Sequence, residues 1–431
     1  MKYRCVRCGK SAYTLNGFTC GCGGNLEVVH AFPEASLEVF EQRLSHMDGP
    51  FSSGVWRYKE LIHPRIGTDS IVTRPEGNTN LYRRGGVSRY TGVERLQLKH
   101  EGENPTGSFK DRGMTVAVSE AVRSGASIVA CASTGNTSAS MAAYAAQVGL
   151  KAVVFIPEGE IAYGKLAQAL AYGAQVIQVR GSFDDAMRIV KESRSELGFY
   201  VLNSLNPWRV EGQKSIVFEI LQQRRWQPPD WIVVPAGNLG NTAAFGKALR
   251  ELKQLGLIDK TPRIASIQAE GASPFYRLWR GKLNHLEAVK PETVASAIKI
   301  GNPVSWVKAL DAIRETDGVV ERVSDTEIMN AKAVVDASGV GCEPASAASV
   351  AGAKKLREAG VIGPDEEVVC VLTGNLLKDP ENTVKYHMGE LASIDALYMN
   401  RPVKVEPYVG SIERLLRQPN GQPLEAVVAG S

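Results

Sequence analysis

Five short apolar runs recur along the chain, and each is followed by a longer segment of mixed polarity. The runs cover residues 127–131, 151–157, 175–179, 231–235 and 368–372. Such short runs rich in Val and Ile indicate strands that are buried on both faces, as in parallel sheets covered by helices. Helices are expected after the first two runs, over about residues 136–147 and 164–172. The pattern predicts an α/β protein, but Rossmann and related doubly wound sheets share it, so it does not identify a function.

The composition argues against several classes of function. Hydrophobic residues make up 44% and charged residues 22% of the 431 residues, which is typical of a globular protein. The net charge of +4 is too small to favour nucleic acid or a membrane surface as a partner. The uncharged stretch 124–150 is interrupted by polar residues at 133–138, which a lipid-facing helix would not carry at its middle. The first residues lack the apolar segment of a secretory signal, so we expect a cytoplasmic protein.

Four of the seven cysteines lie within the first 22 residues. Cys5 and Cys8 form a Cys-x-x-Cys pair, and Cys20 and Cys22 form a tighter Cys-x-Cys pair. Two close pairs of thiolates suit a tetrahedral, structural Zn²⁺, and the neighbouring glycines allow tight turns around it. The alternative is a ribbon that no longer holds metal. The other three cysteines are expected to be buried thiols: Cys131, Cys342 and Cys370.

A lysine stands at the expected start of a helix, after a strand predicted at 96–99. The segment reads Asn-Pro-Thr-Gly-Ser-Phe-Lys-Asp-Arg-Gly from Asn104 to Gly113, and the lysine is Lys110. A lysine held by such turn residues can form a Schiff base with an aldehyde cofactor, pyridoxal phosphate (PLP). Taken alone, however, a charged triplet at a helix start is usually a solvated surface.

Three further polar segments follow predicted strands, at 133–138, 235–242 and 373–379. The first offers hydroxyls and N–H groups that suit a carboxylate, or that only cap a helix. The second carries Gly237 and Gly240, which let the backbone approach a phosphate, but it lacks the dinucleotide fingerprint Gly-x-Gly-x-x-Gly. Because the carboxyl ends of parallel strands meet at one edge of a sheet, we expect all four segments to form one site.

These four segments resemble the signature sequences of the threonine synthases. The matches are the segment at 104–113, Ser-Thr-Gly-Asn-Thr at 133–137, Gly-Asn-Leu-Gly-Asn at 237–241 and Thr-Gly-Asn-Leu-Leu-Lys-Asp at 373–379. That family belongs to the PLP-dependent fold type II group, with tryptophan synthase β and threonine dehydratase. The resemblance implies a two-lobed α/β enzyme with parallel sheets covered by helices, to which the cysteines add a small zinc-ribbon-like unit. Asn375-Leu376 departs from the His-Gly of many members, so the contacts there are expected to differ.

The resemblance assigns roles residue by residue. Lys110 would hold PLP, Asn136 would bond its 3′-oxygen, and Thr373 would contact its pyridine nitrogen without supplying a negative charge. The PLP phosphate would be cradled by the backbone of Gly237, Asn238, Leu239, Gly240 and Asn241. The substrate's carboxylate and phosphate would be bound by Ser133, Thr137, Ser204, Asn206 and Arg209. Without the resemblance, a surface position for Arg209 is an equal alternative.

The implied reaction converts O-phospho-L-homoserine and water to L-threonine and phosphate, with Lys110 moving protons among the substrate carbons. One alternative is a sibling PLP lyase, such as a cysteate synthase or a threonine or serine dehydratase. Another is a non-catalytic zinc-ribbon binding protein on a PLP scaffold. The resemblance also implies a homodimer, while the small net charge leads us to expect no nucleic acid or membrane partner.

Four segments are expected along the chain. Residues 1–30 would form the zinc-ribbon-like unit, and residues 31–95 a linker and the first part of the catalytic unit. Residues 96–388 would form the PLP-dependent unit, with a smaller lobe at about 120–205. Residues 389–431 would be a C-terminal extension.

Overall fold

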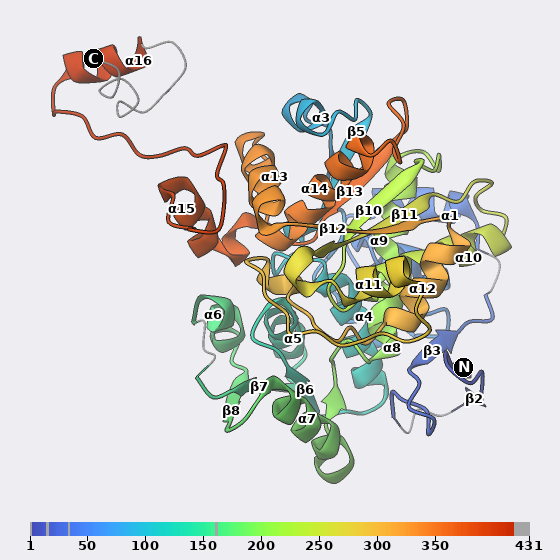
Figure 1. Cartoon of the computed structure of the whole chain (residues 1–431). Coiled ribbons are helices and arrows are strands. Elements are labelled where there is room, and N and C mark those ends of the chain that lie inside the picture. The colour runs from blue at the N-terminus through green and yellow to red at the C-terminus, as the bar shows by residue number, and fades with distance from the viewer. Residues whose placement is uncertain (1, 14–16, 33–34, 160–162, 418–431) are drawn as a thin grey trace.

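The computed structural model describes residues 2–13, 17–32, 35–159 and 163–417. Three sheets organise these residues, and the view in Figure 1 separates a larger helix-covered body from a smaller one. Residues 14–16 of the predicted zinc-ribbon-like unit and residues 418–431 of the predicted C-terminal extension lie outside the described residues.

The largest sheet has six strands in the order β12-β11-β10-β13-β5-β4, and all neighbours are parallel except β4 and β5. Its strands are β4 (Leu81–Tyr82), β5 (Leu96–His100), β10 (Trp231–Pro235), β11 (Arg263–Ala269), β12 (Val319–Val323) and β13 (Val368–Leu372). Helix α14 (Pro344–Glu358) packs on β10, β11, β12 and β13. Small residues let this helix pack closely on the sheet. At Gly352, for example, an added Cβ would lie 2.5 Å from the Ile267 side chain of β11. This sheet therefore joins the strands that precede three of the four polar segments.

The second sheet has four parallel strands in the order β8-β7-β6-β9. They are β6 (Ile128–Ala132), β7 (Lys151–Pro157), β8 (Gln175–Val179) and β9 (Tyr200–Val201). Helices α5 (Asn136–Gln147) and α7 (Phe183–Leu197) pack against β6 and β7, and α6 (Tyr163–Ala171) packs on α5. The α/β class with parallel sheets, predicted from the apolar runs, is confirmed.

Several strands lack the continuous apolar runs used for the prediction. β11 contains Ser266 and Gln268, both buried and both hydrogen-bonded to side chains or backbone nearby. β12 carries Glu321 and Arg322 at the edge of its sheet, where side chains remain partly exposed. The prediction depends on continuous apolar runs. A strand does not show such a run when its buried polar residues have local partners, or when it lies at the edge of its sheet.

Between the two parallel sheets run the helices that position the site. α4 (Lys110–Arg123) packs on α5 and on α8 (Pro207–Gln213), and α8 packs on α10 (Gly240–Gln254). α9 (Ser215–Gln223) follows α8 directly, and α12 (Trp306–Glu315) packs on α10. The remaining α-helices are α1 (Leu37–Gln42), α2 (Lys59–Ile62), α3 (Gly85–Thr91), α11 (Pro274–Gly281), α13 (Asp325–Ala337), α15 (Pro380–Met388) and α16 (Val409–Leu416).

The N-terminal residues form a third, antiparallel sheet in the order β2-β1-β3, and the C-terminal residues leave the body as an arm. The strands are β1 (Lys2–Cys5), β2 (Ser11–Ala12) and β3 (Leu26–Val29). The described part of the arm ends in α16, which lies away from the other described elements (Figure 1). In the described part of the chain, no helix has the length and apolar character needed to cross a membrane.

Candidate active site

Lys110 is the first residue of α4, and a set of backbone and side-chain contacts fixes that position. Phe109 N–H donates to the Thr373 carbonyl at 3.0 Å, which ties the helix start to the end of β13. The Asp111 carboxylate accepts from Thr106 N–H at 2.7 Å, from the Thr106 hydroxyl at 2.6 Å and from the Ser140 hydroxyl at 2.5 Å. A charged triplet on a solvated surface is therefore excluded, because Asp111 and Arg112 are fully buried.

The surroundings of Lys110 favour its neutral form. Burial, and then the nearby Arg209 cation, lower the pKa of Lys110 to about 7, against an opposing effect of Glu343. Its Nζ lies 4.0 Å from the centre of the Phe109 ring. An amine with this pKa is substantially uncharged at neutral pH, so it can act as a nucleophile or as a base.

Glu343 faces the same site, although the sequence motifs gave it no role. Its carboxylate accepts from Asn136 Nδ2 at 3.1 and 3.3 Å and from the Thr373 hydroxyl at 3.5 Å. Burial raises the pKa of Glu343. A Cβ at Gly374 would lie 2.4 Å from Glu343 Oε1, so glycine leaves room for the carboxylate. The available signal was a glutamate preceding a helix-initiating proline, a position where short polar residues are the usual caps.

Thr373 and Asn136 thus meet at Glu343, while their contacts with the pyridine nitrogen and the 3′-oxygen of PLP stay predictions. The Thr373 hydroxyl also lies 3.1 Å from the Ser346 hydroxyl on α14. Asn136 begins α5, whose preceding residue Gly135 makes no side-chain cap. The Ser133 hydroxyl accepts from Gly135 N–H at this helix start, so the predicted alternative of capping by a hydroxyl is not contradicted.

The loop after β10 is built to receive an anion. Leu239 has φ of 64°, and a Cβ at Gly237 would lie 3.1 Å from the Ile298 backbone. Among the described residues, the backbone N–H groups of 237–242 have no hydrogen-bond acceptor. Free N–H groups at the start of a helix bind phosphate through direct hydrogen bonds and the helix dipole.

Three buried polar atoms around this loop also have no partner in the described part of the chain. They are Gln213 Oε1, Asn241 Oδ1 and Ser305 Oγ. Hydroxyl groups and rotated amides can donate to phosphate oxygens, so the loop and its surroundings fit the phosphate of PLP.

Arg209 is buried on α8, so its predicted alternative as a surface residue is wrong. Its Nη1 donates to the Leu202 carbonyl at 3.2 Å, and its Nε has no partner among the described residues. Burial lowers the pKa of Arg209 to about 10. Because no carboxylate of the described chain pairs with it, this guanidinium is available for an anionic substrate.

The other predicted substrate residues differ in their burial and in the hydrogen bonds that their side chains already make. The Asn206 amide caps α8 by accepting from Trp208 N–H at 3.0 Å, and it donates to the Val201 carbonyl at 3.0 Å. Asn206 therefore holds the segment that carries Arg209. Ser204 is half-buried, the Ser133 hydroxyl accepts from Gly135 N–H at 3.2 Å, and Thr137 is buried at the first turn of α5.

The four N-terminal cysteines lie together. Their sulfur atoms are all within 4.8 Å of one another, with Cys5 and Cys22 at 3.5 Å and Cys8 and Cys20 at 3.7 Å. A Cβ at Gly24 would lie 2.6 Å from Cys5 Sγ, so a glycine is needed beside the cluster. Four thiols in this arrangement fit a closed tetrahedral metal site. The expected burial of the other three thiols is confirmed: Cys131, Cys342 and Cys370.

Three hydrogen bonds join residues in or next to β3 to the elements of the site. Asn25 Nδ2 donates to the Val304 carbonyl at 2.6 Å, and the next residue, Ser305, donates its N–H to the Asn238 carbonyl at 3.3 Å. Lys247 of α10 donates to the Val28 carbonyl at 2.6 Å. The third contact is between His30 and Glu211 of α8, at 2.7 Å.

Comparisons with known proteins agree with this geometry. A family described as "Pyridoxal-phosphate dependent enzyme" matches residues 72–374. Threonine synthase of Methanocaldococcus jannaschii is 46% identical over 422 residues, covering 97% of this chain and 100% of the relative. The chain is a member of the threonine synthase family. The threonine synthase of Methanosarcina acetivorans, of the same family, is also 46% identical, over 88% of this chain and 93% of its own length.

Solved structures show the same fold. Escherichia coli threonine synthase matches with a TM-score of 0.68 and 19% identity, over 96% of this chain and 99% of that chain. Maize serine racemase matches with a TM-score of 0.63 and 18% identity, over 83% of this chain and 98% of that chain. The predicted two-lobed fold of the PLP-dependent type II enzymes is confirmed. Within the family, this chain acts on a small-molecule substrate.

Proposed function

We propose that this chain is a threonine synthase that converts O-phospho-L-homoserine and water to L-threonine and phosphate. The observation that carries the proposal is the pair of anion sites beside Lys110. One is the loop of unpaired N–H groups after β10, and the other is the buried Arg209, which no acidic side chain of the described residues neutralises. A PLP enzyme acting on a phosphorylated amino acid needs both, one for each phosphate.

In this proposal the chain's residues divide the work by position. Arg209, helped by Ser133 and Thr137, binds the anionic groups of the substrate, and Asn206 holds Arg209 in place. Bound PLP would supply the electron sink for charge that develops on the substrate carbons. The Lys110 amine takes the proton from Cα and exchanges protons at Cβ and Cγ as phosphate leaves Cγ and water adds at Cβ. A pKa of about 7 lets the same amine accept and return protons at neutral pH.

The test is a substrate panel with product identification. The purified enzyme with PLP is given O-phospho-L-homoserine, O-phospho-L-serine with sulfite, and L-threonine. We expect threonine and phosphate from the first substrate, and loss of both products in Lys110→Ala. Release of a keto acid from threonine, or of cysteate from phosphoserine, as the main activity would replace this proposal by a sibling lyase.

We also propose that Cys5, Cys8, Cys20 and Cys22 hold a structural Zn²⁺. The support is the sulfur cluster and the glycine packed against it. Metal analysis of the full chain should give one zinc per chain, and Cys5→Ser or Cys20→Ser should lose it. Protein purified without a chelator that contains no zinc would contradict the assignment.

We further propose that the protein is a homodimer and that it is cytoplasmic. We also propose that its segments are divided after residues 30, 95 and 388, as expected from the sequence. The C-terminal arm supports the dimer, because Val409 and Leu416 of α16 are 79% and 78% exposed, which suits contact with a second copy. Light scattering should give twice the chain mass for the full chain. In a chain that ends at residue 399, the measured mass should fall toward that of a monomer. An unchanged dimer mass would show that the arm is not part of the interface.

A further inference from the structure

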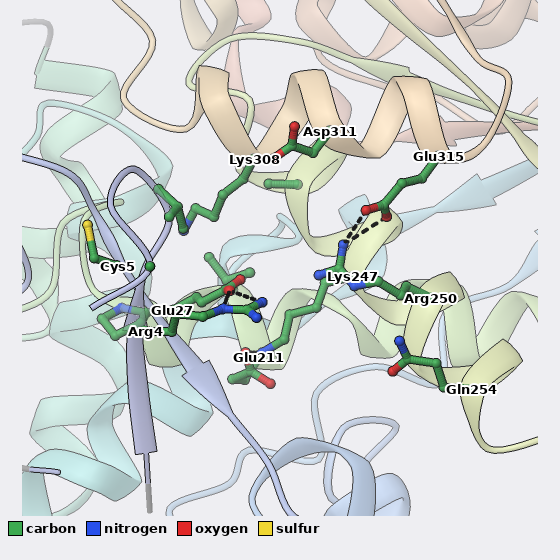
Figure 2. Close-up of a pocket in the computed structure, with 15 residues that line it drawn as sticks. Arg4, Cys5, Glu27, Glu211, Lys247, Arg250, Gln254, Lys308, Asp311 and Glu315 are labelled. Carbon is green, nitrogen blue, oxygen red and sulfur yellow. Dashed lines mark hydrogen bonds and ion pairs between the residues drawn. The ribbon is translucent and has the colours of Figure 1, made fainter. Parts of the chain in front are cut away.

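A cavity lies between the N-terminal sheet and the catalytic body, and Lys110 does not line it. It has a volume of about 440 Å³ and is walled by residues of β1, β3, α8, α10 and α12. Figure 2 shows charged side chains converging on it from these elements. None of the residues assigned above to PLP or to substrate lines it, so its occupant would be a different molecule.

Most of the charges in this cavity already neutralise one another. Arg4 pairs with Glu27 at 2.6 Å across β1 and β3, and Arg250 pairs with Glu315 at 2.8 Å between α10 and α12. A third pair joins Lys247 to Glu211 of α8. Four cationic and four acidic side chains line the cavity in all. A ligand with a net charge would therefore meet as much repulsion as attraction.

Two of these eight side chains remain without an ion-pair or hydrogen-bond partner among the described residues. They are Lys308 and Asp311, three residues apart on α12 and hence on one face of that helix. Lys308 is half-buried and Asp311 is exposed, so the free cation lies deeper and the free carboxylate lies nearer the mouth. Burial lowers the pKa of Lys308, against the opposing effect of the nearby Glu27 and Glu211 carboxylates.

The rest of the wall is apolar. Val6 of the N-terminal unit, Val210 of α8 and Ala243 of α10 line the cavity between its charged groups. A ligand that satisfies this lining must carry one negative group, one positive group and an apolar portion.

We propose that this cavity binds an α-amino acid with an apolar side chain, as its zwitterion. The carboxylate would pair with Lys308, the ammonium group would pair with Asp311 at the mouth, and the side chain would contact Val6, Val210 and Ala243. The ligand completes two charges that the protein leaves unpaired and leaves the existing three pairs intact.

Calorimetric titration of the full-length holoenzyme tests the proposal without any turnover. The probes are L-leucine, 4-methylpentanoate, which lacks the amine, and 3-methylbutylamine, which lacks the carboxylate. We expect one L-leucine per chain, and at least tenfold weaker binding of either analogue. No binding of L-leucine up to 20 mM, at roughly the weak limit of specific small-ligand affinity, would overturn the proposal. Equal binding of 4-methylpentanoate would also overturn it.

Matched variants locate the site. Lys308→Met and Asp311→Asn should each weaken L-leucine binding at least tenfold, whereas the exposed Lys151→Met and Asp365→Asn should bind as the unmodified chain does. Asp311 is exposed, so its variant keeps the test decisive if Lys308→Met folds poorly. The yellow absorbance of the PLP Schiff base should not change on titration. A spectral change that accompanies binding would place L-leucine at Lys110 and overturn the proposal, whatever the outcome of the substrate panel.

Discussion

The Lys110 amine lies between a cation and a carboxylate, and these two groups have opposite effects on its pKa. Arg209 lowers the pKa and Glu343 raises it, while burial gives the largest effect and sets the value near 7. Residues on α8 and at the start of α14 thus adjust a pKa that is set mainly by burial. Neither of these residues is near Lys110 in sequence.

We expect the pKa of Lys110 in the PLP-free enzyme to respond to each neighbour with a defined sign. Arg209→Met removes a repelling cation and should raise this pKa above 7, whereas Glu343→Gln removes an attracting carboxylate and should lower it. The pH dependence of Lys110 acetylation, followed by peptide mass spectrometry, measures both shifts. The exposed Lys151 serves as an internal reference, and shifts of the same sign in the two variants would contradict the arrangement.

Gly374 offers a second test at a single position. The Cβ of Gly374→Ala would come within 2.4 Å of Glu343 Oε1, so the carboxylate must move away from Asn136 and Thr373. We expect at least a tenfold loss of turnover, with the fold retained. In Gly67→Ala the added methyl meets nothing within 4 Å, and turnover should not change. Equal activity of the two variants would show that the position of Glu343 is unimportant.

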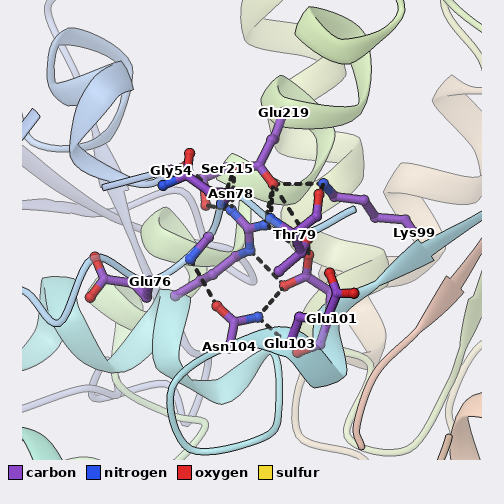
Figure 3. Close-up of polar contacts among 12 residues, drawn as sticks. Gly54, Glu76, Asn78, Thr79, Lys99, Glu101, Glu103, Asn104, Ser215 and Glu219 are labelled. Carbon is purple, nitrogen blue, oxygen red and sulfur yellow. Dashed lines mark hydrogen bonds and ion pairs between the residues drawn. The ribbon is translucent and has the colours of Figure 1, made fainter. Parts of the chain in front are cut away.

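Helix α4 is anchored by a network of buried charges below the active site. Arg112 pairs with Glu101 at 2.6 Å and with Glu219 at 2.8 Å. Lys99 pairs with Glu219 at 2.6 Å, and Figure 3 shows these two residues beside Glu101 and Thr79. Thr79 also accepts from Arg112 at 3.2 Å. All of these side chains are buried, so their charges are compensated almost entirely by each other.

Arg112→Met should destabilise the protein by about 3–5 kcal/mol, since it leaves two buried carboxylates with one lysine between them. The expected result is a large decrease of the midpoint in urea unfolding. Arg250→Met removes a partly exposed ion pair and should cost about 0–1 kcal/mol. Similar midpoints for the two variants would mean that the network contributes no more than a surface pair.

The same network predicts how stability depends on acid. Arg112 and Lys99, acting against burial, hold the pKa of Glu219 well below its usual value of 4.5. The folded protein therefore keeps Glu219 ionised where the unfolded chain would take up a proton. The stabilisation is complete above about pH 5 and is lost progressively as the pH falls further. In Glu219→Gln the urea unfolding midpoint should depend less on pH below about pH 5. An unchanged dependence would show that other carboxylates cause the loss of stability in acid.

The starts of α5 and α10 could be predicted because each follows a strand with a continuous apolar run, whereas the position of Lys110 was predicted from the turn residues before it, since β5 reads Leu-Gln-Leu-Lys-His. The start of α4 at Lys110 and the bounds of α5 at 136–147 agree with expectation, as do β7, β8, β10 and β13. Glu343 and Gln213 were not predicted as site residues, because they come to the site through helix packing and not from a strand end. The burial of Arg209 likewise depends on the packing of α8 against α4, which spacing in the sequence cannot reveal.

At the scale of the whole molecule, the N-terminal unit is bonded to the segments that form both anion sites. Its contacts reach α8, which carries Arg209, α10, whose start forms the phosphate loop, and the residue before Ser305. Removing the proposed zinc should therefore weaken PLP binding at a distance. Dialysis against a chelator should increase the PLP concentration needed for half-saturation by about tenfold, and re-added zinc should restore it. Unchanged PLP affinity in zinc-free protein would show that the unit does not support the site.

These same contacts join residues that are far apart along the chain. Asn25 and Val304 are separated by 279 positions, Val28 and Lys247 by 219, and His30 and Glu211 by 181. During synthesis the N-terminal unit emerges first, and its partners Glu211, Lys247 and Val304 leave the ribosome much later. Closing such long loops is slow, since the entropy is lost before the contacts form. Docking of the N-terminal unit is therefore expected to be among the last steps of folding, so that an incomplete chain has neither anion site in its final form.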